Sequence, residues 1–194
     1  FSSLRRGLIE KCPHAKVFNF ISLAGQHQGI YGIPKCPSET NFSCELLRKF
    51  LNLFAYTEWA QSHIAQATYW HDPIRVKQYR ERSTFIAEIN NEKSINKDYV
   101  YRLHRLNRFV MVKFLRDEMV QPLESQWFGF YAPASNRIIQ NLTVSEMYSS
   151  DKLGLKQMME DGKLLFLAVD DVHLKISREW FSREIMPLLK EGKK

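Results

Sequence analysis

The sequence has no long apolar run. Its longest uninterrupted apolar stretches, such as residues 164–169, fall far short of the roughly 20 residues that a membrane-spanning helix needs. We therefore expect a soluble chain without stable membrane insertion. Phe1 is neither an initiator methionine nor the head of a signal peptide, so the chain is expected to begin within a longer sequence.

Cysteine is also scarce. Cys12, Cys36 and Cys44 form neither a C-x-x-C pair nor a zinc-binding pattern, so no metal site is expected. Cys36 and Cys44 are close enough to close a small ring across a segment of turn-forming residues, and a disulfide is their natural pairing. The alternative is two reduced cysteines in a cytosolic protein.

Charge of one sign is in excess, but it is not clustered. There are 28 basic and 21 acidic residues, and the net charge of +7 favours approach to anionic partners. The basic residues are dispersed and no recognition signature is present, so nucleic acid is not an expected partner. With 194 residues, 44% of them hydrophobic, and no repeat, one domain of ordinary size accounts for the chain.

Two apolar runs each end in a charged loop. Residues 109–115 are nearly all apolar, which is typical of a parallel strand covered on both faces, and Asp117 follows them. Residues 164–169 repeat the pattern, and His173 follows those. In open α/β sheets the site lies beyond the carboxyl ends of the strands, so the two loops could bring Asp117 and His173 together.

The order of these two residues is informative. Acid first and histidine second is the order in α/β-hydrolases, in which a serine precedes both. The alternative is an ordinary loop acid and a structural histidine. His71, which lies two residues before Pro73, is expected to be a hydrogen-bonded structural residue rather than a base.

A third apolar run, residues 17–23, ends at Gly25, Gln26, His27 and Gly29. Gln26 and His27 are therefore expected to line the same site, where polar groups could position a carbonyl or a water molecule. The alternative is a structural turn that depends on the two glycines.

The segment 25–107 reads as helical between two strands. Helices are predicted at residues 44–54, 58–68, 79–91 and 97–107, after a first helix at 3–11. This segment is longer than a simple crossover, so we interpret it as a helical insertion or cap. The apolar stripe of residues 44–54 is either core or the wall of a groove for an apolar ligand.

Several long segments in the same order resemble the lysosomal palmitoyl-protein thioesterases. They are AGQHQGIYGIPKCP at 24–37, TYWHDPI at 68–74, FVMVKFLRDEMVQPLESQWFGFY at 109–131, DKLGLK at 151–156 and DVHLKISREWF at 171–181. The resemblance implies an α/β-hydrolase fold, a large helical insertion that helps to form a fatty acyl groove, and a serine, aspartate and histidine triad. Asp117 and His173 match the acid and the base, and no cofactor is implied.

The nucleophile of this triad is not found in the chain. The family's serine lies in a G-x-S-x-G elbow before the helix that begins here, and Ser2 and Ser3 lack the flanking glycines. We therefore expect residues 1–194 to be the carboxyl-terminal portion of one α/β-hydrolase domain, inactive alone. A module that binds acyl chains without cleaving them is the alternative.

The resemblance further implies removal of palmitate and other long acyl groups from S-acylated cysteines of proteins or peptides in the lysosome, with secretion as a second destination. It supports the Cys36–Cys44 bridge and a partner for Cys12 upstream. Asn41 and Asn141 begin sequons, which carry sugar only on a secretory route.

Overall fold

The computed structural model describes residues 2–32 and 42–192. At its centre is a parallel three-stranded sheet in the order β1-β2-β5, with Val110 of the middle strand opposite Ile21 and Leu165. The strands are β1 (Asn19–Leu23), β2 (Arg108–Phe114) and β5 (Leu164–Val169). All three were predicted, although β1 begins two residues later than its apolar pattern suggests.

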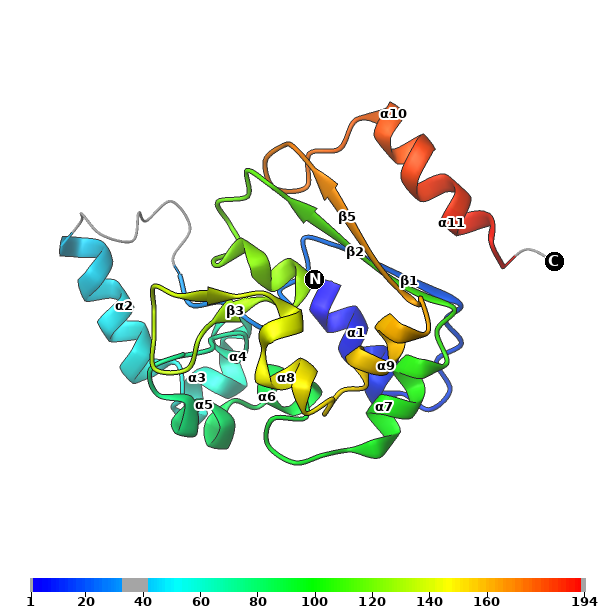
Figure 1. Ribbon diagram of the computed structural model, residues 1–194. Coiled ribbons are helices and arrows are strands. Elements are labelled where there is room, and N and C mark those ends of the chain that lie inside the picture. The colour runs from blue at the N-terminus through cyan, green and yellow to red at the C-terminus, as the bar shows by residue number, and fades with distance from the viewer. Residues whose placement is uncertain (1, 33–41, 193–194) are drawn as a thin grey trace.

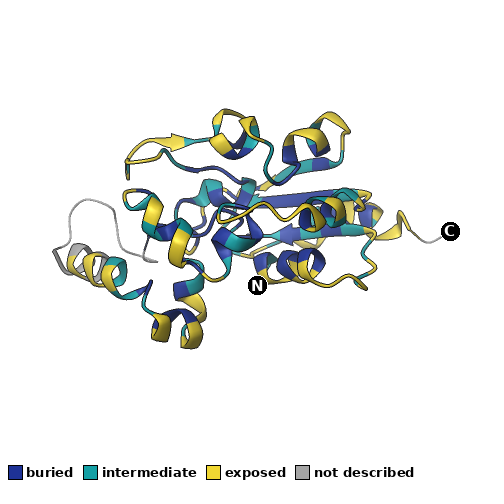
Figure 2. Ribbon diagram, turned by 90° about the horizontal axis from the view of Figure 1, so that it is seen from below, coloured by how far each residue is buried: buried dark blue, intermediate teal, exposed yellow. Residues whose placement is uncertain are grey.

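The middle strand is buried on both faces, which explains its nearly continuous apolar sequence. On one face, Phe109 and Met111 pack with residues of α1, α7 and α9; on the other, Val110 and Val112 pack with residues of η3 and α11. The sheet therefore lies between two helical layers (Figure 1; Figure 2). The outer elements are α1 (Ser2–Lys11), α9 (Leu155–Glu160), α10 (Arg178–Trp180), η3 (Phe181–Ile185) and α11 (Met186–Lys190).

The segment between β1 and β2 is helical, as predicted, and part of it forms a separate core around Tyr79, Ile86 and Trp70. The helix predicted at 58–68 breaks at Ile64, and the helix predicted at 79–91 breaks after Arg82, because Ile64 and Ser83 adopt extended backbone angles. The helices are α2 (Phe42–Phe54), α3 (Glu58–His63), α4 (Ala65–Thr68), α5 (Val76–Arg82), α6 (Ile86–Ile89) and α7 (Lys97–His104).

The apolar stripe of α2 divides between two environments. Leu51 and Phe54 pack against the core of the helical segment, whereas Leu46, Phe50 and Leu53 are exposed. The stripe is thus partly core and partly open surface.

A region of short elements connects β2 to β5. Within it, Trp127 and Phe128 pack against the sheet, since Trp127 meets Phe166 edge to face and Phe128 is fully buried in the core that includes Phe109 and Met111 of β2. The elements are η1 (Leu123–Trp127), β3 (Phe130–Tyr131), β4 (Ile139–Gln140), η2 (Leu142–Val144) and α8 (Glu146–Ser149). In the described part of the chain, no helix is both long enough and apolar enough to cross a membrane.

Candidate active site

Asp117 and His173 meet at the carboxyl edge of the sheet. His173 Nδ1 lies 2.7 Å from Asp117 Oδ2, although 56 positions separate the two residues. Backbone hydrogen bonds join their loops: the amide of Leu115 donates to the carbonyl of Val169 and the amide of Arg116 donates to the carbonyl of Asp171. The extension of β2 and β5 beyond the sheet therefore brings the two side chains together.

The carboxylate of Asp117 is buried and held from several sides. Oδ1 accepts hydrogen bonds from the backbone amides of Met119 (2.7 Å) and Val120 (3.1 Å), and Oδ2 accepts one from Gln126 Nε2 (2.9 Å). None of the side-chain surface is exposed. These donors offset the cost of burying the carboxylate and fix its direction.

His173 keeps one ring nitrogen available. A carboxylate oxygen only accepts hydrogen bonds, so Nδ1 donates to Asp117 and the neutral ring has its lone pair on Nε2. Nε2 has no hydrogen-bond partner among the described residues, and 31% of the side chain is exposed. The next residue, Leu174, has a φ of 59°, so the backbone turns sharply after the histidine. The ring can therefore act as a base toward a group outside.

His27 does not line this site. Its ring is fully buried, stacks on Phe128 at 4.8 Å and meets Phe109 edge to face, while Nε2 is bonded to Ser22 Oγ. Burial, followed by the nearby charge of Arg6, lowers the pKa of His27 well below 6.5. The prediction that His27 lines the substrate site is therefore wrong, because apolar side chains enclose its ring in the core.

The glycines beside His27 support the alternative, a structural turn. A Cβ on Gly25 would collide with Ser22 Oγ and His27 Nε2. Gly29 has a φ of +80°, and a Cβ there would lie 2.5 Å from the carbonyl oxygen of Tyr69. Gln26 is half-buried on the same turn, just past the end of β1.

His71 is a structural residue, as expected. Nδ1 lies 2.6 Å from the carbonyl oxygen of Gln28, and the buried ring stacks between Tyr79 and Phe130. Burial lowers its pKa from 6.5 to about 3, so the ring is neutral.

The remaining predicted positions are spread over the chain. Asn141 is exposed, and Cys12 is exposed with a free thiol. Cys36 and Asn41 lie outside the described residues, so the Cys36–Cys44 bridge and the Asn41 sequon stay predictions.

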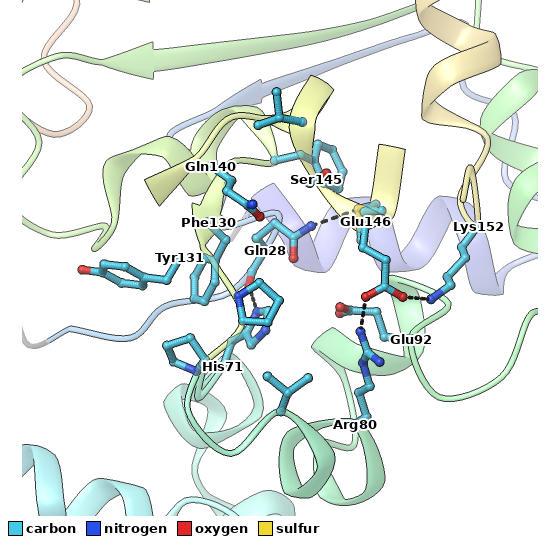
Figure 3. Close-up of a pocket in the computed structure, with 16 residues that line it drawn as sticks. Gln28, His71, Arg80, Glu92, Phe130, Tyr131, Gln140, Ser145, Glu146 and Lys152 are labelled. Carbon is cyan, nitrogen blue, oxygen red and sulfur yellow. Dashed lines mark hydrogen bonds and ion pairs between the residues drawn. The ribbon is translucent and has the colours of Figure 1, made fainter. Parts of the chain in front are cut away.

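A separate pocket of about 200 Å³ lies between α5, β3 and α8 (Figure 3). Its lining includes neither Asp117 nor His173, and its volume is below the 300 Å³ or so that is usual for ligand sites. Arg80 and Lys152 point at the same carboxylate, that of Glu146, at 2.9 and 2.7 Å. Because these charges pair with one another, the pocket gives no reason to move the candidate site away from Asp117 and His173.

Sequence reasoning missed two residues that organise the site. Gln126 donates to Asp117, and Arg116 joins the two loops by contacts to Asp170 and Asp171. Neither residue stands in a recognisable motif. No group of three or more histidine, cysteine, aspartate or glutamate residues that could hold a metal ion occurs in ranges 2–32 and 42–192.

A parallel sheet between helical layers, with an acid and a histidine on loops after neighbouring strands, is an α/β-hydrolase type of architecture. The family model of the palmitoyl protein thioesterases matches residues 2–173. The chain belongs to this family.

Curated relatives agree with this assignment. The chain is 39% identical over 181 residues to "Palmitoyl-protein thioesterase 1" of Caenorhabditis elegans, covering 93% of this chain and 60% of that protein. It is 33% identical to "Palmitoyl-protein thioesterase 3" of Dictyostelium discoideum (88% and 57% covered) and 30% identical to "Lysosomal thioesterase PPT2" of Bos taurus (82% and 52% covered). The chain therefore spans between half and two thirds of the length of these relatives.

Proposed function

We propose that the protein containing this chain is a thioesterase that removes palmitate and other long fatty acyl groups from S-acylated cysteines of proteins or peptides. The observation that carries this proposal is the 2.7 Å contact between His173 Nδ1 and the buried Asp117, with Nε2 left available. A carrier that only binds acyl chains needs no oriented base, so this contact favours hydrolysis over carriage.

In the proposed mechanism, His173 Nε2 takes the proton of a serine hydroxyl as the serine oxygen attacks the thioester carbonyl. Asp117 holds the ring and stabilises the imidazolium that forms. When the C–S bond breaks, His173 returns the proton to the leaving thiolate. A water molecule, activated by the same nitrogen, then hydrolyses the acyl-enzyme and releases the fatty acid.

The serine is proposed to lie in a segment that precedes Phe1. Ser2 Oγ donates a hydrogen bond to the carbonyl of Leu23 (2.8 Å), so helix α1 begins beside the carboxyl end of β1 (Figure 1). A residue just before α1 would therefore share the sheet edge with Asp117 and His173. The G-x-S-x-G elbow of α/β-hydrolases occupies such a strand-to-helix turn.

Substrate affinity is proposed to come from the acyl chain, since each buried methylene contributes about 0.8 kcal/mol. The helical segment 25–107 is proposed to be an insertion in the hydrolase domain, and the exposed apolar residues of α2 are candidates for contact with the chain. Gln26 is proposed to contact the acyl group from the end of β1. If Gln26→Ala changes neither kcat nor KM, this last assignment fails.

A lysosomal location is proposed because a relative is named a lysosomal thioesterase. The oxidising secretory route fits a Cys36–Cys44 bridge. Mass spectrometry of non-reduced peptides tests the bridge, and two free thiols in protein from a secretory host would contradict it.

The deciding experiment uses the full-length protein and a palmitoyl thioester. His173→Ala should abolish turnover while circular dichroism stays that of the wild type. His14→Ala, at an exposed histidine outside the site, is the matched control and should keep full activity. Near-normal turnover by His173→Ala would refute the assignment.

A further inference from the structure

Gln126 has a buried side-chain amide whose oxygen and nitrogen both make hydrogen bonds. It lies on η1 and its side chain has no exposed surface. Its Oε1 accepts a hydrogen bond from the backbone amide of Phe114 (3.0 Å), and its Nε2 donates to Asp117 Oδ2 (2.9 Å). Because a backbone N–H can only donate, Oε1 must face Phe114, and the amide nitrogen must face the carboxylate.

The same oxygen of Asp117 accepts from Gln126 and from His173. The other oxygen is held by two backbone amides, those of Met119 and Val120. Among the described residues, Gln126 and His173 are thus the side chains that contact this carboxylate. Gln126 thus donates to the same oxygen, Oδ2, that accepts from the imidazole of His173.

The segment that carries Gln126 is itself firmly attached. Ser125 Oγ donates to the carbonyl of Gly29 (2.7 Å), and Trp127 Nε1 donates to the carbonyl of Met111 (3.0 Å). Three consecutive residues of η1 therefore bind the turn after β1, the acid and β2. A side chain mounted on such a support can hold a neighbour to within a fraction of an ångström.

We propose that Gln126 is a positioning residue for the Asp117–His173 pair, acting on the reaction through the carboxylate. This proposal rests on the proposed hydrolase function. The proposal depends on the chemistry of the amide group. Asp117 Oδ2 needs a hydrogen-bond donor that does not itself accept the Nδ1 proton of His173, and the NH₂ group of glutamine meets that requirement at every pH.

The test compares Gln126→Leu and Gln126→Glu in the full-length enzyme. Leucine keeps the volume but removes the donor, so kcat for a palmitoyl thioester should fall about 10- to 100-fold with little change in KM, a loss typical of side chains that orient a functional ligand.

Glutamate gives a conditional rescue. Two adjacent carboxyl groups can share one proton, which restores the hydrogen bond to Asp117, but they repel when both are ionised. Gln126→Glu should therefore recover most of the wild-type kcat at acidic pH and lose it toward neutral pH. A purely structural role would not make the rescue depend on pH.

Gln61→Leu is the matched control. Gln61 is another buried glutamine, donating to the carbonyls of Ala55 and Ala67 in the helical segment. Its replacement should lower the melting temperature and leave kcat per folded enzyme unchanged.

The outcomes separate the two hypotheses. If His173→Ala is inactive but folded Gln126→Leu keeps kcat within twofold of the wild type, the role of Gln126 is refuted and the proposed hydrolase function is retained. If His173→Ala is active, the proposed hydrolase function itself is refuted. Should Gln126→Leu not fold, Gln126→Glu decides, and a profile equal to that of the wild type at every pH refutes the proposal.

Discussion

Ser22 Oγ and His27 Nε2 lie 2.7 Å apart in the interior of the protein, and neither side chain has exposed surface. A serine and a histidine in hydrogen-bond contact are the usual sign of an activated nucleophile. Here the pair is closed in by Phe109 and Phe128, and burial lowers the pKa of His27. The contact therefore stabilises the turn after β1, and the candidate base is His173.

The first prediction follows from this contact. Ser22→Ala should leave thioester hydrolysis by the full-length protein unchanged. His27→Leu should lower the free energy of unfolding by about 1–3 kcal/mol, because it leaves the buried Ser22 hydroxyl without a partner. Chemical denaturation measures the second effect, with His14→Leu at the surface as control. Loss of activity in a stable Ser22→Ala protein would contradict this reading.

The second prediction concerns Asp117→Asn. The backbone amides of Met119 and Val120 keep an oxygen at the Oδ1 position, so the new NH₂ group takes the place of Oδ2, where it faces His173 Nδ1 and also the donor nitrogen of Gln126. The imidazole must then accept at Nδ1 and carry its proton on Nε2, the wrong tautomer for a base. A loss in kcat on the order of 10⁴-fold is expected.

Steady-state kinetics on the full-length protein measures this loss. Asp161→Asn is the control, because Asp161 is an exposed carboxylate whose partner is Gln157, on the surface. A kcat for Asp117→Asn within tenfold of the wild type would show that the acid has no such role.

The sequence predicted the parts of this site that depend on local pattern. Apolar runs followed by Asp117 and His173 were sufficient to predict the strands and their common edge, because a parallel strand buried on both faces must be apolar throughout. The contact itself then followed from the geometry of parallel sheets, in which carboxyl ends coincide.

The sequence could not predict contacts that depend on packing. His27 stands on a loop after a strand, as His173 does, yet the strand-to-loop pattern carries no information on the Phe128 ring that covers it. Gln126 was missed because its contacts to Phe114 and Asp117 arise from the packing of η1 against β2, which the local sequence does not show. The break at Ile64 was missed because local periodicity does not report the extended backbone at that position.

The third prediction is a dependence of stability on pH. Burial lowers the pKa of His71 from 6.5 to about 3, so between these values the unfolded chain binds a proton that the folded chain does not. The contribution is fully present above pH 6.5 and is lost as the pH falls toward 3. It amounts to a few kcal/mol, since one pKa unit corresponds to about 1.4 kcal/mol.

His71→Gln keeps a donor for the carbonyl of Gln28 and removes the titrating group. Its melting temperature should therefore fall less steeply with acid than that of the wild type. His14→Gln should show the wild-type slope, because His14 is exposed. Equal slopes in His71→Gln and the wild type would contradict the prediction.

The fourth prediction is that Asn141 carries an N-linked glycan in protein from a secretory host. Asn141 is exposed, its backbone is extended, and its side chain makes no capping hydrogen bond to η2. The exposed apolar side chains of Ile138 and Val144 flank it in sequence, and a glycan would shield them from water. Thr143→Ala should abolish the glycan mass and Thr143→Ser should keep it. An unmodified Asn141 in the wild-type protein would refute the prediction.

The fifth prediction is that residues 1–194 expressed alone hydrolyse no palmitoyl thioester. An acid and a base without a nucleophile cannot form an acyl-enzyme, and the chain contains no G-x-S-x-G elbow. Poor folding should accompany this. In the described sheet β1 is an edge strand, and an unpaired edge invites association with other chains. The exposed Leu4 and Leu8 of α1 and the exposed Phe18 add apolar surface.

Expression with the upstream segment should restore solubility and activity together, and replacing the elbow serine by alanine should then remove activity alone. Comparing these two proteins distinguishes inactivity caused by a missing nucleophile from inactivity caused by poor folding. Turnover by purified residues 1–194 that resists a serine-directed inhibitor would mean that the nucleophile is not the upstream serine. Ser22 could not supply that turnover, because its hydroxyl is buried against His27 and no thioester can reach it.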